Sequence, residues 1–481
     1  MRVAMPSGSL QGTVCLLAWS IALAGCAVGP DYGGPAPVAR NSLRATSFAH
    51  ITQASAVSAP APAAWWLALD DPELSALVDT ALANSPTIHA GQARLRQARA
   101  GLNEQRRNEL PKATASAVYL HADLPSSSLG VGPLNLYDIG MDASWEIDLF
   151  GGTRRAIEAA SAEAGAVGAD LEDTHVQLAA EVAVAYVDLR DRQQRVALIR
   201  STAELEQQML DLAQQRRASG VASQLDVERV RAQVQNTRAS LIPLDAQITE
   251  SLDQLAVLTG REPGGLDAEL GAMRPLPMPP NSVAVGDPAS LLRQRPDIRA
   301  AERRLASQNA QIGERKAAWF PKLTLMGNLG FSAAEPGHLV STNNFSWFGL
   351  PYLQWNALDF GRVQARVEQA KAGRDLAQAQ YESTVLGALR DADVALARFG
   401  QERQHAVSLR EVEGSAGRAA ALTQQRYHAG AATALDWLDA ERTRFAAEQN
   451  RVASDAQVIK YYVALQKSLG LGWLVQPTGG S

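Results

Sequence analysis

The feature that most constrains the fold is an internal repeat with one constant offset. The stretch QQRRASGVASQLD (Gln214–Asp226) resembles QQRYHAGAATALD (Gln424–Asp436), which begins 210 residues later (424 − 214). The same offset separates further pairs: Pro86 and Pro296, Pro111 and Pro321, Trp145 and Trp355, Phe150-Gly151 and Phe360-Gly361, and Gly260 and Gly470. One offset at so many landmarks indicates a tandem duplication of a single structural unit.

Each unit predicts the same order of elements. A helix is ended by a proline, which opens a strand; a second strand follows, and then two very long helices joined at a glycine. The turns are expected at Gly220 and Gly430. We expect strands at 113–121, 137–149, 321–331 and 345–356, and long helices at 153–218, 223–259, 362–429 and 433–469. A continuous helix over 153–218 would be roughly 100 Å long at ~1.5 Å per residue. Such helices also occur in long soluble helical bundles. The strands must therefore decide between a soluble bundle and a protein with a membrane part.

The strand around Trp145 alternates strictly. In YDIGMDASWEIDL the odd positions from Tyr137 to Leu149 are apolar and the even ones are polar or small. Thirteen alternating residues exceed the usual strand of about five or six and suffice for the ~9–11 residues that cross a bilayer in a barrel. The even face carries the predicted lumen-facing acids Asp138, Asp142, Glu146 and Asp148. The aromatics predicted for the membrane interfaces are Tyr137, Trp145, Trp347 and Trp355.

One chain supplies only four such strands, which cannot close a barrel with an interior. Open strand edges are not tolerated in lipid, so several copies must share one barrel. Two copies would give eight strands and a filled interior, whereas three would give twelve strands and a pore.

The N-terminus reads as a lipoprotein signal. Arg2 is followed by the ten apolar or small residues Val14–Leu23 and then by Leu23-Ala24-Gly25-Cys26, the pattern of a bacterial lipobox. The expected product starts at Cys26, carries acyl chains on that cysteine and keeps no other thiol, since Cys15 lies in the signal. Ala27 follows, so the aspartate typical of inner-membrane retention is absent. No cofactor is expected apart from this covalent lipid.

Composition excludes several other functions. The net charge is −5, which argues against nucleic acid as a partner. The seven histidines are not clustered, and the chain contains no HExxH, GxSxG or P-loop motif, so neither a metal site nor an enzyme is predicted. After Cys26 no uncharged apolar run reaches the ~18 residues of a membrane helix.

The strand pair, Phe-Gly, long helix, glycine turn and returning helix, doubled behind a lipobox, resemble the TolC-like outer-membrane factors, and among them the efflux outer-membrane lipoproteins. The residues that carry the resemblance are Trp66, Asp71-Pro72-Glu73-Leu74, Arg295-Pro296-Asp297-Ile298, Phe320-Pro321, Asp359-Phe360-Gly361, Leu435-Asp436 and Leu438-Asp439-Ala440. The resemblance implies a mainly α fold with a transmembrane β part: a homotrimer in which a 12-stranded β-barrel continues into a 12-helix periplasmic α-barrel.

This reading sets the expected domain boundaries: signal peptide 1–25, lipid-anchored extended linker 26–64, first repeat 65–260, equatorial segment 261–290, second repeat 291–470 and tail 471–481. The implied function is a passive exit duct in the bacterial outer membrane, extending into the periplasm. Its partners would be a periplasmic adaptor and an inner-membrane pump of the resistance–nodulation–division kind, together with outer-membrane lipid.

The hairpin tips are the expected gate and adaptor-docking sites. The candidate residues are Arg216, Arg217, Gly220 and Asp226 in the first repeat and Arg426, Tyr427, Gly430 and Asp436 in the second. Glycine at a helix end can adopt the left-handed conformation, and a carboxylate early in a helix is favoured by the helix dipole. Asp226 and Asp436 are therefore expected to stabilise helix starts rather than to contact an ion.

Three alternatives stay open at this point. The same duct could serve type I protein secretion or metal-ion efflux. A periplasmic coiled-coil adaptor lipoprotein would carry one hairpin rather than two. A lipoprotein hydrolase would need a catalytic constellation that this sequence does not contain.

Overall fold

A computed structural model describes residues 27–45, 47–48, 56–57, 62–122, 134–280 and 282–473 of the chain. The predicted signal peptide, the lipidation site Cys26 and most of the predicted tail lie outside these residues.

The described chain divides into two compact units that interleave along the sequence. Unit 1 comprises the described residues of Met1–Ala36, Arg94–Gly168 and Ala300–Glu382. Unit 2 comprises those of Pro37–Ala93, Ala169–Arg299 and Ser383–Ser481. Each unit therefore contains part of both sequence repeats, so the compact units do not coincide with the boundaries predicted from the repeat.

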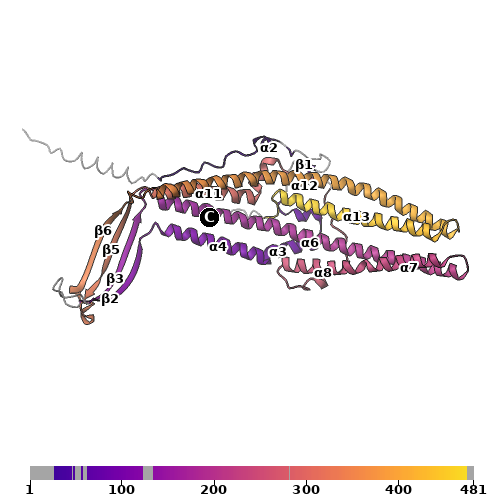
Figure 1. Cartoon of the computed structure of the whole chain (residues 1–481), viewed down its shortest axis with the longest axis horizontal. Helices are drawn as coiled ribbons and strands as arrows, with labels where there is room; N and C mark the ends of the chain where they lie inside the picture. The colour runs from indigo at the N-terminus through magenta and orange to yellow at the C-terminus, as the bar shows by residue number, and fades with distance from the viewer. Residues whose placement is uncertain are drawn as a thin grey trace, which may run out of the picture. The chain divides into compact units, whose positions relative to one another are not determined.

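Unit 1 contains a four-stranded antiparallel sheet with the order β2-β3-β5-β6 (Figure 1). The strands are β2 (Lys112–Ala122), β3 (Leu134–Ile147), β5 (Lys322–Ala333) and β6 (Phe345–Gln354). Each repeat contributes one neighbouring pair, and the two pairs join through β3 and β5. Pro351 lies in the outer strand β6, which fits its missing backbone donor.

Two predicted strands end earlier than expected. β3 stops at Ile147, so including Asp148 and Leu149 in this strand was wrong. Asp148 instead accepts a hydrogen bond from the backbone N–H of Arg154 at 2.9 Å, in the first turn of the following helix. β6 stops at Gln354, so Trp355 follows the strand rather than lying in it.

The duplication extends to helix boundaries. α4 (Pro86–Arg107) and α11 (Pro296–Ala317) both have 22 residues, and α6 (Gly152–Ala218) and α12 (Arg362–His428) both have 67. In each pair both ends are 210 residues apart. Proline opens α4 and α11, where its fixed φ and missing N–H are tolerated.

The two returning arms differ. The predicted single helix over 223–259 is wrong, because α7 (Gln224–Ala239) ends and α8 (Leu241–Leu258) begins on either side of Ser240. Pro243 lacks an N–H and would clash with the carbonyl of Ala239 in a continuous helix. The equivalent of Pro243 in the second repeat is Ala453, and there α13 (Ala434–Ser468) is unbroken.

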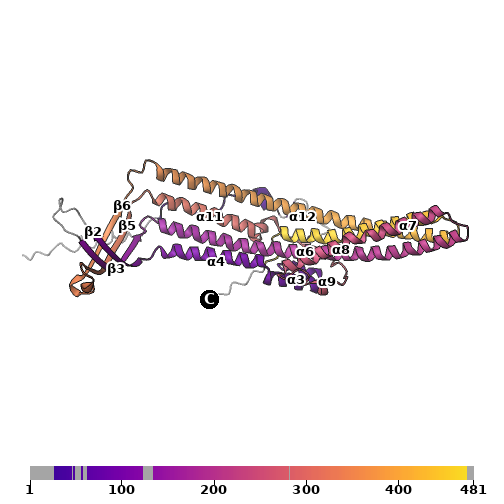
Figure 2. The ribbon, with the colours of Figure 1, turned by 60° about the horizontal axis from the view of Figure 1, so that its bottom comes forward.

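Within unit 2 the returning helices run back along the long ones, as Figures 1 and 2 show for α7 and α13. The other short elements of the described chain are α2 (Arg40–Arg44), β1 (Ala56–Val57), η1 (Trp65–Leu69), α3 (Pro72–Asn84), α9 (Asp267–Leu270), β4 (Val283–Ala284), η2 (Pro288–Ser290), α10 (Leu291–Gln294), η3 (Pro336–His338) and η4 (Thr342–Asn344). β1 pairs in parallel with β4. The linker 26–64 was predicted to be extended. The helix α2 within it departs from that prediction.

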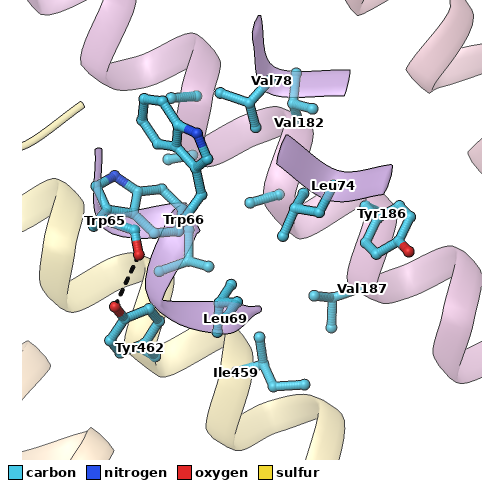
Figure 3. Close-up of a cluster of buried hydrophobic side chains, with 14 of the residues drawn as sticks. Trp65, Trp66, Leu69, Leu74, Val78, Val182, Tyr186, Val187, Ile459 and Tyr462 are labelled. Carbon is cyan, nitrogen blue, oxygen red and sulfur yellow. Dashed lines mark hydrogen bonds between the residues drawn. The ribbon is translucent and has the colours of Figure 1, made fainter. Parts of the chain in front are cut away.

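The main core of unit 2 packs η1 and α3 against α6 and α13 (Figure 3). Trp65 is fully buried and packs edge-on against Tyr462, with ring centroids 6.0 Å apart. The Tyr462 hydroxyl donates a hydrogen bond of 3.1 Å to the backbone carbonyl of Trp65. Asp71 caps α3 by accepting from the N–H groups of Glu73 and Leu74. The motif Asp71-Pro72-Glu73-Leu74 thus starts a helix whose apolar side enters this core.

A buried ion pair ties α6 to α3. Arg190 is fully buried, and its guanidinium pairs with Glu73 and donates to the carbonyls of Leu270 and Ala272 at 3.1 and 2.7 Å. The hydroxyl of Tyr186 donates to Glu73 at 3.0 Å, and burial raises the pKa of this phenol, which keeps it a neutral donor. These contacts fix the segment after α9 against the long helix α6.

Candidate functional site

The sheet of unit 1 has two faces of different chemistry. Asp142 of β3 lies opposite Thr114 of β2 and Asn328 of β5, so these side chains share one face. The next position along β3, Met141, lies opposite Ala115 and Leu329 on the other face. One face of β3 and β5 is therefore predominantly polar and the other predominantly apolar, as the alternation in the sequence predicts. β2 follows this pattern only in part, because Val118 and Leu120 lie on the same face as Thr114 and Ser116.

The acids of β3 are held by cross-strand partners. We define the acidic row as Asp138, Asp142 and Glu146, which occupy alternate positions on the polar face of β3. Asp142 accepts hydrogen bonds from the Ser116 hydroxyl and the Asn328 amide, both at 2.9 Å. Asp138 accepts from the Ser332 hydroxyl at 2.5 Å. These donors are neutral, so they do not compensate the charge of either carboxylate.

Glu146 differs from the other two acids, because its carboxylate pairs with the ammonium of Lys322 at 2.8 Å. The charge at this position is therefore partly compensated. Asp148, the fourth predicted acid, lies beyond the strand, and its carboxylate pairs with the Arg154 guanidinium at 3.4 Å. The net negative charge of the polar face is concentrated at Asp138 and Asp142.

The predicted interface aromatics have distinct surroundings. Tyr137 stacks on Tyr119 of β2 with ring centroids 4.7 Å apart. The indole N–H of Trp145 donates to the carbonyl of Glu109 at 2.8 Å, and the equivalent N–H of Trp355 donates to the carbonyl of Trp319 at 3.1 Å. These two bonds are copies of each other, because both partners are shifted by 210 residues.

The apolar face of the sheet is exposed in the single chain. Trp347 of β6 is 74% exposed and lies opposite Leu329 of β5. Ile139, Met141 and Leu329 on the same face are also exposed. Large exposed apolar surfaces mark contacts with a partner or a lipid phase, and an apolar face backed by a polar one is typical of a transmembrane barrel strand.

Both helical tips in unit 2 are closed by the same capping arrangement. At the first tip Ser223 and Asp226 form a capping box, in which the Ser223 hydroxyl accepts from the Asp226 N–H at 3.1 Å and the Asp226 carboxylate accepts from the Ser223 N–H at 3.1 Å. At the second tip Thr433 and Asp436 form the same box. These boxes satisfy the first amide groups of α7 and α13.

The capping bonds also set the charge of the tips. Hydrogen bonds from the Ser223 hydroxyl and N–H lower the pKa of the Asp226 carboxyl, and those from the Thr433 N–H and hydroxyl lower the pKa of the Asp436 carboxyl. Gly220 and Gly430 precede the boxes with φ values of 76° and 75°, in the region that favours glycine. The two glycines thus lie in the turns, and the two aspartates lie in the first turns of α7 and α13, where they stabilise the hairpins.

A contact between a guanidinium and an aromatic ring joins the two tips of the chain. The Arg216 guanidinium of α6 lies 3.9 Å from the centroid of the Tyr427 ring of α12 and donates to the Tyr427 carbonyl at 3.1 Å. Tyr427 is 3% exposed and packs against Trp437 of α13, with ring centroids 5.2 Å apart. Arg216 therefore connects the first hairpin to the second through a stacked cation and a hydrogen bond.

The two other arginines predicted at the tips, Arg217 and Arg426, do not join the hairpins to each other in the described contacts. Arg426 donates to the carbonyl of Ala431 within its own turn at 3.4 Å, and Arg217 is exposed. Beneath the tips, side chains from α6, α7, α12 and α13 form one small core: Met209, Leu210, Ala213, Val227, Val230, Val234, Tyr427, Trp437 and Leu438. Tyr427 belongs both to this core and to the contact with Arg216.

Among the described residues, no group of three or more His, Cys, Asp or Glu side chains is arranged to hold a metal ion. Within the same residues no helix combines the length and the apolar character that crossing a membrane requires.

Comparison with known proteins decides the family. The family described as "Outer membrane efflux protein" matches residues 77–261 and again residues 288–471. The chain belongs to the outer membrane efflux protein family. The two matches correspond to the two repeats.

Curated relatives of this efflux protein match along nearly the whole chain. Outer membrane protein OprJ of Pseudomonas aeruginosa is 31% identical over 472 residues, which cover 96% of both chains. The toluene efflux pump outer membrane protein TtgF of Pseudomonas putida is 30% identical over 464 residues, covering 95% of this chain and 96% of that protein.

Solved structures share the fold. The outer-membrane channel OprN has a TM-score of 0.87 and 35% identity, covering 93% of this chain and 100% of that one. The MtrE outer membrane channel of Neisseria gonorrhoeae, solved in an open state, has a TM-score of 0.80 and 27% identity, with coverage of 93% and 98%. This efflux protein is thus an outer-membrane channel that extends into the periplasm, and it is not an enzyme. The adaptor and hydrolase alternatives are excluded.

Sequence reasoning missed several residues of the efflux protein that matter to these sites. Lys322, Ser116 and Asn328 hold the acidic row, but a single strand does not reveal its register with its neighbours. Phe348 and Tyr352, which lie on the polar face of the sheet, could have been found, because their spacing from Asp138 and Asp142 is the repeat offset of 210 residues.

Proposed function

We propose that this chain forms a homotrimeric exit duct of a tripartite efflux pump, in which three sheets close one barrel. The observation that supports this most directly is the incomplete sheet of unit 1. Its outer strands β2 and β6 each pair with one strand in the described chain, while one sheet face is apolar and the other largely polar. Unpaired strand edges are not tolerated in lipid, and pairing β6 of one copy with β2 of the next removes them.

The polar face would then line the lumen and the apolar face would contact lipid. Three copies bring twelve strands, enough to enclose water. The interface aromatics Tyr137, Trp145 and Trp347 would lie at the two membrane boundaries, with Trp355 just beyond its strand. Acyl chains on Cys26 would anchor each copy, since more than one chain is needed for a durable anchor. No other cofactor is proposed.

Within the assembly the helical tips are the proposed contact with the periplasmic adaptor and the proposed gate. The inner-membrane pump, of the resistance–nodulation–division kind, would supply the energy. The duct itself would only open and close. The contact between Arg216 and Tyr427 supports the gate, since it joins the two hairpins at their tips, beyond the two cores through which they also pack.

The substrates are proposed to be small organic molecules. The names of the relatives support this class: TtgF is a toluene efflux protein, ArpC of Pseudomonas putida is an antibiotic efflux protein, and SrpC of the same organism is a solvent efflux protein. The pump would select among substrates, and the duct would add only a weak preference by charge.

The acidic row provides the test of this function. In a planar bilayer under a salt gradient, the purified full-length protein should conduct with a modest cation preference, because rings of carboxylates attract cations. Asp142→Asn should reduce that preference. Glu146→Gln should also reduce it, because it leaves the Lys322 ammonium unpaired on the same face. The matched control is Glu146→Gln combined with Lys322→Gln, which removes a pair without net charge and should change the preference little. A reversal potential that Asp142→Asn does not change, or no conductance at all, would contradict the proposed lumen.

A further inference from the structure

The two repeats differ on one face of the sheet. The acids Asp138 and Asp142 of β3 are equivalent, at the offset of 210 residues, to Phe348 and Tyr352 of β6 (348 − 138 and 352 − 142). Leu350 lies between the latter two on the same face. We call Phe348, Leu350 and Tyr352 the apolar strip. The same structural position therefore carries carboxylates in the first repeat and apolar or aromatic side chains in the second.

The register places the apolar strip on the polar face, beside the acidic row. Phe348 lies opposite Asn328, and Asn328 lies opposite Asp142. Tyr352 lies opposite Thr324, and Thr324 lies opposite Glu146. Strands β3 and β6 are separated by one strand, and neighbouring strands lie about 4.8 Å apart, so the acidic row and the strip are roughly 10 Å apart.

The strip is not buried against the rest of the described chain. Phe348, Leu350 and Tyr352 are 56%, 52% and 47% exposed, and Met326 beside Leu350 is 44% exposed. Lipid cannot account for these side chains, because the opposite face of the sheet holds Trp347 and Leu329. An exposed apolar patch of this kind marks a surface that contacts a ligand or a partner.

We propose that the acidic row and the apolar strip together form a contact zone for amphiphilic organic cations in the lumen. The proposal rests on the proposed function, which makes this face the lumen, and it names the substrate class that this face would favour. In a trimer the acidic rows and strips would alternate three times around the wall. A cation carrying aromatic or aliphatic groups can reach a carboxylate and the strip at once.

The two halves of the zone attract different features of a solute. A small hydrated inorganic cation is attracted chiefly by Asp138 and Asp142, and an uncharged apolar solute is attracted chiefly by the strip. An organic cation gains from both, because the ring faces of Phe348 and Tyr352 also attract positive charge. Such contacts are weak at exposed sites, which suits a duct that must release what it carries.

The experiment compares two cations of equal charge on the full-length protein in planar bilayers. Tetraphenylphosphonium should reduce the sodium current at lower concentration than tetramethylammonium does. Phe348→Ser should raise the blocking concentration of tetraphenylphosphonium by about two- to five-fold, the loss expected for one exposed cation–ring contact. Blocking by tetramethylammonium should change less, because this small ion has little apolar surface to place against the strip. Ser346→Ala, on the same strand and face, is the matched control and should change neither.

A second measurement does not require current. Fluorescence polarisation of rhodamine 6G with the protein in lipid nanodiscs, corrected for empty nanodiscs, should show weaker binding for Phe348→Ser by a similar factor. Equal block by the two cations, or block and binding unaltered by Phe348→Ser, would overturn the proposal. So would a Phe348→Ser variant that changes only the temperature at which the trimer dissociates, because the strip would then be a seam between copies. A wild-type protein that binds the dye without conducting would count against the proposed duct and not against this zone.

Discussion

Replacing Arg216 by alanine removes the contact that joins the two helical tips. The guanidinium lies 3.9 Å from the Tyr427 ring centroid and donates one hydrogen bond of 3.1 Å to the Tyr427 carbonyl. Tyr427 itself stays packed against Trp437 and the small core under the tips. The substitution should therefore loosen the contact between the tips while the two cores keep both hairpins folded and packed together.

The size of the effect follows from the two lost interactions. A cation over an exposed ring contributes about 0.5–1 kcal/mol, and a hydrogen bond contributes about 0.5–1.5 kcal/mol net. The two contributions add to about 1–2.5 kcal/mol per chain. That corresponds to a shift of roughly 5- to 70-fold in the balance between joined and separated tips. In a trimer that opens in one step, the three contributions would multiply.

The assay is single-channel conductance of the full-length protein in planar bilayers. Arg216→Ala should raise the mean conductance or the fraction of time spent in the larger conductance states. The matched control is Arg217→Ala, which removes an exposed charge at the neighbouring position. Arg216→Lys should fall between wild type and alanine, because an ammonium keeps the charge but loses the planar stacking.

Equal conductance of Arg216→Ala and wild type would refute this reasoning if hydrogen exchange at the tips were also unchanged. An equally large effect of Arg217→Ala would also refute it, because bulk charge rather than the ring contact would then set the conductance.

Two further predictions concern the periplasmic helices. Glu73→Gln should lower the free energy of unfolding, measured by denaturant titration, by about 3–5 kcal/mol, because it leaves the buried Arg190 charge uncompensated. The control Arg274→Gln removes a 54% exposed partner 3.7 Å from Glu73 and should lower it by under ~1 kcal/mol. Equal losses for the two variants would contradict the importance of the buried pair. The carboxyl groups of Asp226 and Asp436 have folded-state pKa values below their unfolded values. Their contribution to the stability of the helix starts is therefore present above about pH 4 and is lost as the pH falls through the lower folded value. Protection of the first amides of α7 and α13 from hydrogen exchange should fall in that acid range, and unchanged protection down to about pH 2 would contradict this prediction.

Much of the fold could be predicted because each element occurs twice in the duplicated sequence. The strands and long helices follow from alternation, from proline positions and from the shared offset. Where one repeat carries a feature that the other lacks, a prediction from the shared pattern failed. Pro243 breaks the first returning arm, whereas Ala453 lets the second run on. The effect of Pro243 on the carbonyl four residues earlier was visible in the sequence and was missed.

Among the candidate sites, contacts between residues close in sequence could be predicted and contacts between distant residues could not. The capping residues Asp226 and Asp436 could be placed at helix starts because their partners are three residues away. The link between Arg190 and Glu73 joins residues 117 positions apart, and the pair of Lys322 with Glu146 depends on the register of β3 and β5. Neither distance nor register is encoded in a local pattern, so these contacts needed the structure.

The shared barrel is the central claim, and the native mass tests it most directly. The protein would be extracted from membranes with detergent, and its native mass would be compared with the mass of the denatured subunit from the same preparation. The account predicts a native protein mass three times that of the subunit, with a subunit that begins at an acylated Cys26. A monomer that stays in solution without detergent would contradict it, because strands with one apolar face and unpaired edges would then never enter a membrane.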